Sequence, residues 1–381
     1  MTPWVGTFLS RGASTAVSFG MAAAQVVAPV VALAATLAAA LAVAGAGGAS
    51  ADTIRLRIGA GHPGNATWTA AMREVFQPGV ASRVENETGN KLEWVETYGG
   101  AVCKLGECLE AVESGLLDIG DVESIFEPAK LQALNFSLFV PFSIPDPVLN
   151  TKVVQDVYNR VPQLKDTLKK YNQVYLGAGI IGNYGILTAF PWEKQADLVG
   201  RKIAAGGPNI PWIAPIGIVP VQAVLTEVYT SLQTGVYQGV VMFPDAVISF
   251  RLNEVAKQFA EMNFGTVASA LLTINKTTWD GLSPAVQKIL TEEGARWSSE
   301  LGTRTARLQA EALVKMEASG VKLVKVSDAD RHAWAAKLDN LPKRRYEELI
   351  KAGQPANAIY EYIRLQKEAG HVFPRDWAAE K

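Results

Sequence analysis

The residue types that most often carry catalytic or metal chemistry are scarce in this chain of 381 residues. It has three histidines and two cysteines: His62, His332 and His371, and Cys103 and Cys108. The histidines are scattered, so no metal-ligand spacing is present and we expect no bound metal. No nucleophile-elbow, P-loop, zinc-protease or EF-hand pattern occurs. His62 could be drawn into a triad with a serine and a carboxylate, but no spacing requires it, and glycosidase-type carboxylate pairs stay open.

One glycine pattern matches a dinucleotide fingerprint. Gly177, Gly179 and Gly182 form GxGxxG directly after a predicted strand, Asn172–Ala178. A dinucleotide site needs a helix to open there, so that its N-terminus faces the pyrophosphate. The residues that follow, 183–188, indicate a turn and a strand instead. We interpret the pattern as coincidental and expect no cofactor.

The N-terminus is typical of an export signal. From residue 12 to residue 51 there is no charged side chain, and the stretch is mostly Ala, Val and Leu. It ends in Ala49-x-Ala51, whose small side chains suit a signal peptidase. We predict a signal peptide over 1–51, cleaved before Asp52, and a periplasmic location. The apolar run is longer than a usual signal core, so an uncleaved anchor is the competing interpretation.

Export changes the interpretation of the two cysteines. Cys103 and Cys108 could form a disulfide in an oxidising compartment, closing a short loop with a small entropic gain. A metal site would need two further ligands that the sequence does not supply nearby. A pair of buried free thiols remains the alternative.

Composition narrows the class of protein. The chain is 49% hydrophobic and 19% charged, and Lys+Arg 36 against Asp+Glu 37 leaves a net charge of −1. A nucleic-acid binder needs a surplus of basic residues, so we expect no nucleic-acid partner. The length suffices for two domains. The uncharged stretches 172–192 and 203–226 are interrupted by Gly, Pro and Asn, which favours buried strands and turns over membrane helices.

Two stretches of the chain alternate strand and helix patterns. The first predicts a mixed α/β layer with a largely parallel sheet, from strand Ile54–Ala60, helix Thr67–Thr88, strand Lys91–Thr97, helix Glu107–Ser114 and strand Leu116–Gly120. The pattern recurs with strands Asn172–Ala178 and Arg201–Ala205, helix Thr226–Gln233 and strand Gly239–Phe243. The last third predicts helices over Ser283–Ser319 (one long helix or two), Asp328–Leu338 and Pro342–Gly353, followed by a polar tail. An exported α/β protein without a catalytic signature is more often a binding protein than an enzyme, so we predict no enzymatic activity.

Four blocks in the second half carry a family resemblance. They are LVGRKI at Leu198–Ile203, GIVPV at Gly217–Val221, EVYTSLQTGVYQG at Glu227–Gly239 and NEVAK at Asn253–Lys257. In order and spacing they resemble the solute-binding proteins of tripartite ATP-independent periplasmic (TRAP) transporters, the C4-dicarboxylate-binding-protein-like family. The likeness extends over the chain after residue 51, including the Tyr98-Gly99-Gly100 turn.

The resemblance implies a fold and a set of partners. The fold would be α/β, a two-domain periplasmic-binding-protein clam-shell with mixed sheets flanked by helices and a long C-terminal helix spanning both domains. Domain I would comprise 52–181 plus 268–307, and domain II 182–267 plus 308–381 with the C-terminal helices. The protein would act as a monomer, capture a small organic solute between its domains and deliver it to the small and large membrane subunits of a permease.

The departures from the family pattern concern the solute. The family places an Arg, which clamps a substrate carboxylate, where this chain has Ala204, and many members have a second Arg where we place Tyr184. Gln238 replaces the family's Asp, and Val241–Phe243 replaces polar residues. A buried carboxylate would lack its guanidinium unless Arg201, just before the expected position, takes over. We therefore expect an atypical pocket and an amine-bearing or aromatic solute rather than a simple carboxylate.

The resemblance also indicates which residues would contact the solute. The candidates at family-like positions are His62, Asn65, Tyr98, Glu123, Tyr184, Asn209, Trp212, Phe243 and Asp245. Trp212 and Phe243 could equally be core residues, and Glu123 and Asp245 could be cap or hinge residues. Two other classes stay open: a sensory binding protein that serves a receptor kinase, and a periplasmic enzyme on a similar fold.

Overall fold

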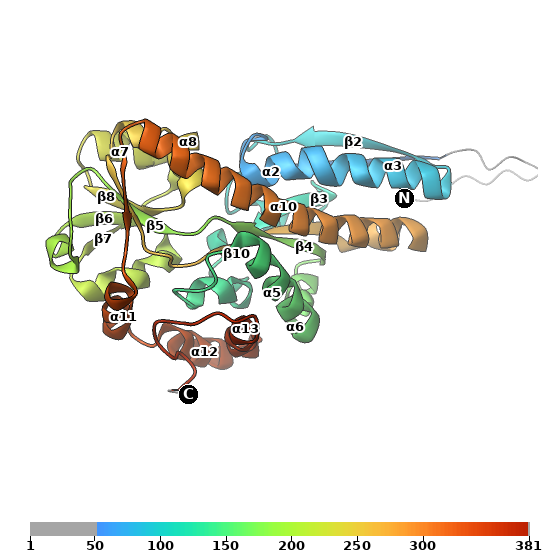
Figure 1. The fold of residues 1–381 in the computed structure, drawn as a ribbon. Helices are drawn as coiled ribbons and strands as arrows, with labels where there is room; N and C mark the ends of the chain where they lie inside the picture. Colours follow the sequence, from blue (N-terminus) through green and yellow to red (C-terminus); the bar gives the residue numbers. More distant parts are fainter. Residues whose placement is uncertain (1–51, 380–381) are drawn as a thin grey trace, which may run out of the picture. The chain divides into compact units, whose positions relative to one another are not determined.

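Two β-sheets organise residues 52–379, the part of the chain that the computed structural model describes (Figure 1). Helices flank both sheets, which confirms the predicted mixed α/β fold. The predicted signal peptide, residues 1–51, lies outside the described residues.

The first sheet has the strand order β2-β1-β3-β10-β4. Its strands are β1 (Thr53–Ala60), β2 (Lys91–Thr97), β3 (Ile119–Glu123), β4 (Gln173–Ile181) and β10 (Val267–Asn275). β1 pairs in parallel with β2 and β3, as the first alternating stretch predicts. β10, however, runs antiparallel between β3 and β4, so the sheet is less parallel than expected. Every residue of β10 is buried, which removes the alternation that would reveal a strand in the sequence.

The second sheet has the strand order β11-β9-β5-β8-β6-β7. Its strands are β5 (Gly185–Thr188), β6 (Lys202–Ala205), β7 (Val219–Gln222), β8 (Gly239–Met242), β9 (Gln258–Glu261) and β11 (Lys322–Lys325). β6 pairs in parallel with β7 and β8, and β5 runs antiparallel to β8 and β9. The GxGxxG pattern ends just after β4 and is followed by β5 rather than by a helix. The turn and strand predicted after this pattern are therefore confirmed.

The helices before the last third are short or interrupted. The predicted helix Thr67–Thr88 is present as α2 (Thr67–Ala71), a π-turn (Met72–Phe76) and α3 (Gln77–Thr88). The others are α4 (Cys108–Glu113), α5 (Pro147–Arg160), α6 (Gln163–Lys169), α7 (Val228–Gln233) and α8 (Pro244–Ser249). Short 3₁₀ segments cover Ser124–Phe126, Gln132–Phe139, Gln195–Leu198, Gly207–Trp212, Ala214–Ile216, Leu225–Glu227 and Leu252–Glu254.

One long helix contacts elements of both sheets. After the short α9 (Lys276–Asp280), α10 runs over Pro284–Ala318, a single helix of 35 residues (Figure 1). Its hydroxyl cap Ser283 and Pro284 in the first turn start it as the sequence predicts. It packs on β4, α5 and α3, and further along on α8 and β11. Gly294 allows this closeness, because a Cβ there would lie 2.4 Å from the carbonyl oxygen of Leu176 in β4.

The C-terminal segment differs from the predicted polar tail. α11 (Asp328–Lys337) and α12 (Leu341–Lys351) match the predicted helices, but α13 (Asn357–Glu368) follows them. Ile359, Tyr362 and Ile363 of α13 are buried, and the helix packs against α5. The tail prediction was wrong because the apolar spacing in this stretch is helical. After α10, β11 joins the second sheet, whereas α13 packs against α5. The predicted domain ranges, which assign all of 308–381 to domain II, stay predictions.

Two segments of the chain cross from one sheet to the other, and they are hydrogen-bonded to each other. Residues 182–184 link β4 to β5, and residues 262–266 link β9 to β10. The backbone N–H of Tyr184 donates to the carbonyl of Gly265 at 3.1 Å, and the N–H of Gly265 donates to Oδ1 of Asn183 at 3.1 Å. Gly265 has φ +104°, and a Cβ there would lie 2.0 Å from Oγ of Ser143, so only glycine fits. These bonds hold Tyr184 where the sheets meet.

Within residues 52–379, no helix is both long and apolar enough to cross a membrane. The uncharged stretches 172–192 and 203–226 form strands, turns and short helical segments, as predicted.

Candidate functional site

A cavity of about 110 Å³ is lined by residues that belong to, or follow, strands of both sheets. The volume is the space open to the centres of water molecules, so several waters or a small solute fit. We call the side formed by the first sheet and its connections the first wall: His62, Trp68, Glu123, Phe126, Ile181 and Ser269. The opposite side, the second wall, includes Tyr184, Asn209, Leu225, Val241, Met242 and Phe243.

His62 comes from the loop after β1, and the turn after β2 holds that loop. Gly99 has φ +74° and Gly100 φ +82°, conformations that favour glycine. The N–H of Gly99 donates to the carbonyl of His62 at 2.8 Å, and the N–H of Gly100 donates to the carbonyl of Ala60 at 3.2 Å. The YGG turn therefore positions the imidazole at the cavity.

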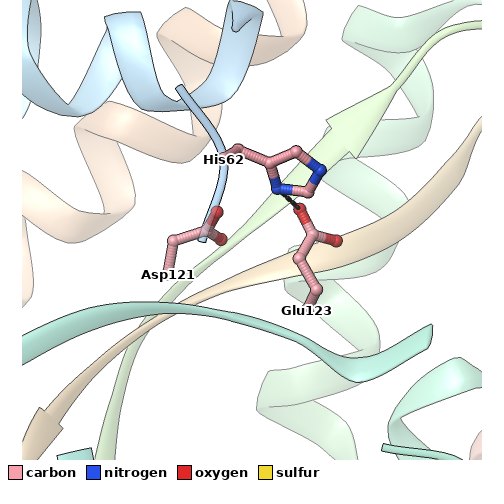
Figure 2. Close-up of side chains that lie close together, drawn as sticks. All are labelled: His62, Asp121 and Glu123. Carbon is pink, nitrogen blue, oxygen red and sulfur yellow. Dashed lines mark ion pairs between the residues drawn. The ribbon is translucent and has the colours of Figure 1, made fainter. Parts of the chain in front are cut away.

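Glu123 ends β3 and points toward His62 (Figure 2). Its Oε2 accepts a hydrogen bond from Oγ of Ser269 at 3.0 Å, and its Oε1 lies 3.7 Å from Nδ1 of His62. Burial raises the pKa of Glu123, and burial lowers the pKa of His62 to about 4. His62 is therefore neutral at pH 7, so the contact is not an ion pair at that pH.

Asp121 lies on the same face of β3, two residues before Glu123 (Figure 2). It is 2% exposed, and neither carboxylate oxygen has a hydrogen-bond partner. Burial, and then the nearby charge of Glu123, raise the pKa of Asp121, while the indole N–H of Trp68 acts in the opposite direction. That indole forms no hydrogen bond of acceptable geometry either. The first wall thus contains buried polar groups that its own fold leaves unpaired.

Tyr184 stands in the second wall among aromatic rings. Its ring packs edge-on against Phe243 at 5.1 Å and against Trp212 at 5.6 Å between centroids. Burial, Glu123 and Asp245, in that order, raise the pKa of Tyr184. The phenol therefore keeps its proton at neutral pH and can donate a hydrogen bond.

Asp245 is the second residue of α8, two positions after Phe243 in the chain. Its Oδ2 accepts a hydrogen bond from Oγ1 of Thr67 at 3.2 Å, which links α8 to α2. Its Oδ1 has no partner, and burial raises its pKa to about 6.

Five of the nine candidate residues line the cavity: His62, Glu123, Tyr184, Asn209 and Phe243. Asn209 is buried, and its Nδ2 has no partner. Asp245 is not a lining residue, although it acts on the pKa of Tyr184.

The other three candidates lie off the cavity lining. Asn65 is exposed in its loop. Tyr98 is turned toward α3, where its hydroxyl donates to Oε1 of Gln77 at 2.7 Å. Trp212 is fully buried behind Tyr184 and donates from Nε1 to the carbonyl of Leu138 at 3.1 Å, the core position that the sequence left open.

The two positions discussed for a carboxylate clamp also lie off the cavity lining. Ala204 is fully buried in β6, where the next residue, Ala205, lines the cavity instead. Arg201 places its guanidinium over the ring of Phe190, 4.4 Å from the centroid. Among the described residues, those that line this cavity include no lysine and no arginine.

Sequence reasoning missed Asp121, Trp68 and Phe126. The strand predicted at Leu116–Gly120 starts at Ile119 and runs to Glu123, so Asp121 is a strand residue rather than a turn residue. That shift places Asp121 and Glu123 on one face, and a strand end predicted at Glu123 would have revealed the pair. Trp68 and Phe126 carry no signal that separates them from core aromatics.

The two cysteines form a disulfide in the structure, Cys103–Cys108. The loop that it closes packs on the His62 loop, since a Cβ on Gly61 would lie 2.7 Å from the backbone nitrogen of Leu105.

Two sheets joined by crossing segments, with a cavity lined from both, define the class of two-lobed solute-binding proteins. The sequence model of the DctP family, described as "Bacterial extracellular solute-binding protein, family 7", matches residues 79–349. The chain belongs to this family, and the predicted resemblance to TRAP solute-binding proteins is confirmed.

Curated relatives match parts of the chain. The C4-dicarboxylate-binding periplasmic protein DctP of Rhodobacter capsulatus is 32% identical over 149 residues, 38% of this chain and 44% of the relative. The 2,3-diketo-L-gulonate-binding periplasmic protein YiaO of Escherichia coli K12 is 31% identical over 156 residues, 39% of this chain and 45% of the relative. The chain therefore spans less than half the length of these two relatives.

Solved structures share the fold. A TRAP periplasmic solute-binding protein from Desulfovibrio salexigens has a TM-score of 0.72 at 20% identity and covers 83% of this chain and 96% of its own. One from Bordetella bronchiseptica, with bound mandelate, has a TM-score of 0.71 at 21% identity and covers 83% and 99%. One from a Sulfitobacter species, with bound β-D-galacturonate, has a TM-score of 0.65 at 19% identity and covers 80% and 99%.

Proposed function

We propose that this protein is the periplasmic solute-binding subunit of a TRAP-type transporter and that its solute carries an amine or an aromatic ring. It captures the solute in the cavity between its two walls as a monomer and delivers it to the small and large membrane subunits of a permease. The N-terminal 51 residues act as its signal peptide. It is a binding protein, so the solute leaves unchanged.

One observation carries the choice of solute: the cavity lining holds a buried acid and no basic side chain with a charge at neutral pH. Glu123 lines the cavity and Asp245 lies close enough to act on Tyr184, while no described lining residue is a lysine or an arginine. A carboxylate placed here would find no guanidinium to pair with, which is unfavourable in a buried site. A cation would meet two acids instead.

The aromatic residues of the cavity support the same class of solute. Trp68 and Phe126 of the first wall face the cavity together with Tyr184 and Phe243 of the second. Aromatic faces attract an ammonium by cation–π interaction and also stack on a ring of the solute. The unpaired Nδ2 of Asn209 would donate to a hydroxyl or carbonyl of the same molecule.

The proposed solute differs in class from the carboxylate ligands bound in the solved structures of similar fold. Their ligands include mandelate and β-D-galacturonate, both anions, in proteins of about 20% identity to this chain. At that identity the fold is shared while the residues of a binding site can change.

A thermal-shift screen tests the proposal. The full chain is expressed for export, recovered from the periplasm of the host and melted with aliphatic amines, betaines, aromatic amines, neutral aromatics, polyols, and mono- and dicarboxylates. At a hundredfold excess over Kd a ligand adds about 2.7 kcal/mol of stability, a rise of several degrees in Tm. We expect such a rise with an amine or an aromatic compound and none with plain carboxylates.

Two further measurements complete the screen. Asp245→Asn and Glu123→Gln should each weaken the shift given by an amine, because each removes one of the acids near Tyr184. Mass spectrometry of the released ligand should recover it unmodified, and conversion would indicate an enzyme instead. A clear shift with a dicarboxylate and none with amines would overturn the assigned solute class.

A further inference from the structure

Three side chains on the first-sheet side of the molecule converge on one point: His62 from the loop after β1, and Asp121 and Glu123 from β3 (Figure 2). Each offers a ligand atom, and these atoms all lie within 4.8 Å of one another. We propose that this cluster binds a divalent metal ion, Zn²⁺ or Mn²⁺, beside the solute cavity, which His62 and Glu123 line. This departs from the sequence analysis, which predicted no metal because the three histidines are scattered.

The spacing of the cluster is close to that of a metal site. Two ligands bound at about 2.1 Å to a tetrahedral ion lie about 3.4 Å apart. Nδ1 of His62 and Oε1 of Glu123 are already 3.7 Å apart. Asp121 can complete the site by rotating its carboxylate, since neither oxygen has a hydrogen bond to break.

An unpaired buried carboxylate points to a ligand independently of the spacing. Asp121 is 2% exposed, and both of its oxygens lack a partner. Nδ1 of His62, the nitrogen that faces the acids in Figure 2, also lacks a partner. Buried polar groups are almost always satisfied in folded proteins, and an ion would satisfy these together.

The donor set selects the kind of ion. One imidazole nitrogen with two carboxylates suits Zn²⁺ or Mn²⁺, whereas Ca²⁺ and Mg²⁺ prefer oxygen ligands throughout. A doubly charged ion would balance the two carboxylates, which leaves Asp245 as the negative group beside Tyr184. Oγ of Ser269 donates to the other oxygen of Glu123 at 3.0 Å, an outer contact that orients this ligand.

Three protein ligands leave at least one coordination position open. His62 and Glu123 both line the cavity, so that position would face the space where the solute binds. The ion would therefore be available to a hydroxyl or carbonyl oxygen of the solute, since an ammonium group has no lone pair to coordinate it. This last point rests on the proposed function, whereas metal binding itself does not.

Metal titration of the exported protein tests the proposal. The protein is dialysed against EDTA and then titrated by calorimetry with ZnCl₂, MnCl₂ and, for comparison, MgCl₂, without any solute. We expect one Zn²⁺ or Mn²⁺ per chain and at least tenfold weaker binding of Mg²⁺. Co²⁺ provides a readout on the unaltered protein, because ligation by nitrogen and oxygen in a low-symmetry site gives visible absorption bands.

Variants locate the ion. His62→Gln and Asp121→Asn should each weaken binding at least tenfold, and Ser269→Ala should weaken it less. His332→Gln is the matched control, because His332 is exposed on α11 and away from the cluster. Circular dichroism melts of each variant establish that it is folded before titration.

Several results would overturn the proposal: no heat and no Co²⁺ bands with the unaltered protein, equal binding by Asp121→Asn, or an amine that excludes the ion competitively. The last result would assign the cluster to the ammonium group of the solute. A failed metal titration leaves the solute screen unaffected, and a failed amine screen leaves the titration unaffected, so the two proposals fail separately.

Discussion

The two walls of the cavity differ in how their polar groups are arranged. The first wall contains His62 and Glu123, and Asp121 lies beside them on β3, so two of these three polar residues are acids. The second wall is lined mostly by aliphatic side chains, and its polar members, Tyr184 and Asn209, are uncharged. The acid on that side, Asp245, is not a lining residue and accepts a hydrogen bond from Thr67 of α2.

This difference indicates a division of labour. Under the proposed function, charge recognition would belong to residues at the carboxyl ends of β1 and β3, where several buried polar atoms have no hydrogen-bond partner. The apolar second wall would exclude water and so strengthen each electrostatic contact of the first. Tyr184 stands on the second wall, and burial, Glu123 of the first wall and Asp245, in that order, raise its pKa.

The largest effect is expected from Tyr184→Ala. The change removes an aromatic ring from the second wall and should weaken binding of the natural solute by about a hundredfold or more. It should also cost about 3–5 kcal/mol in the free energy of unfolding, because the ring is buried against Trp212 and Phe243. Calorimetric titration with the solute found in the screen measures the first effect, and denaturant unfolding the second.

Two variants serve as controls for Tyr184. Tyr184→Phe keeps the packing and tests the hydroxyl alone. Ala204→Arg should not improve binding of carboxylates, since Ala204 is fully buried and lies off the cavity lining. Unchanged affinity in Tyr184→Ala would remove this residue from the site.

The disulfide allows the first wall to be perturbed selectively. Cys103–Cys108 closes a short loop beside the His62 loop, and the chain has no other cysteine. Reduction should cost about 2 kcal/mol of stability by the loop-entropy relation. Melts with and without a reductant measure this, with Cys103→Ser/Cys108→Ser as the comparison. Reduction that leaves Tm unchanged would mean that the loop does not brace the first wall.

The smallest effect concerns pH and Asp245. Burial raises the pKa of Asp245 to about 6 in the folded protein, above its ordinary value of 3.8. The folded state therefore binds the proton more tightly, so the stabilising contribution is fully present below pH 3.8 and is lost as pH rises through 6. Between pH 5 and pH 8 the unliganded protein should lose on the order of 1 kcal/mol relative to Asp245→Asn. Unfolding curves of both proteins at the two pH values test the sign, and a parallel pH dependence would contradict it.

Much of the framework followed from local patterns in the sequence. Alternation identified β1 and β2 closely, and the four blocks between Leu198 and Lys257 identified the family. Five of nine candidate site residues line the cavity, because motif positions carry information about which strand ends face the cleft. Tyr98 and Trp212 lie off the cavity lining, and a sequence position does not reveal which neighbour takes up a side-chain hydrogen bond, here Gln77 and Leu138.

The sequence by itself determined the class of fold, the family and the lack of a basic residue at the expected clamp positions. Tertiary structure alone decided that β10 runs antiparallel within the first sheet and that Asp121 meets His62, 59 positions away in the chain. Periodicity reports the environment of each residue within its own element, whereas pairing between strands depends on contacts distant in sequence. The cluster of the first wall exists because β1 and β3 pair in parallel, which brings the carboxyl ends of both strands to the same edge.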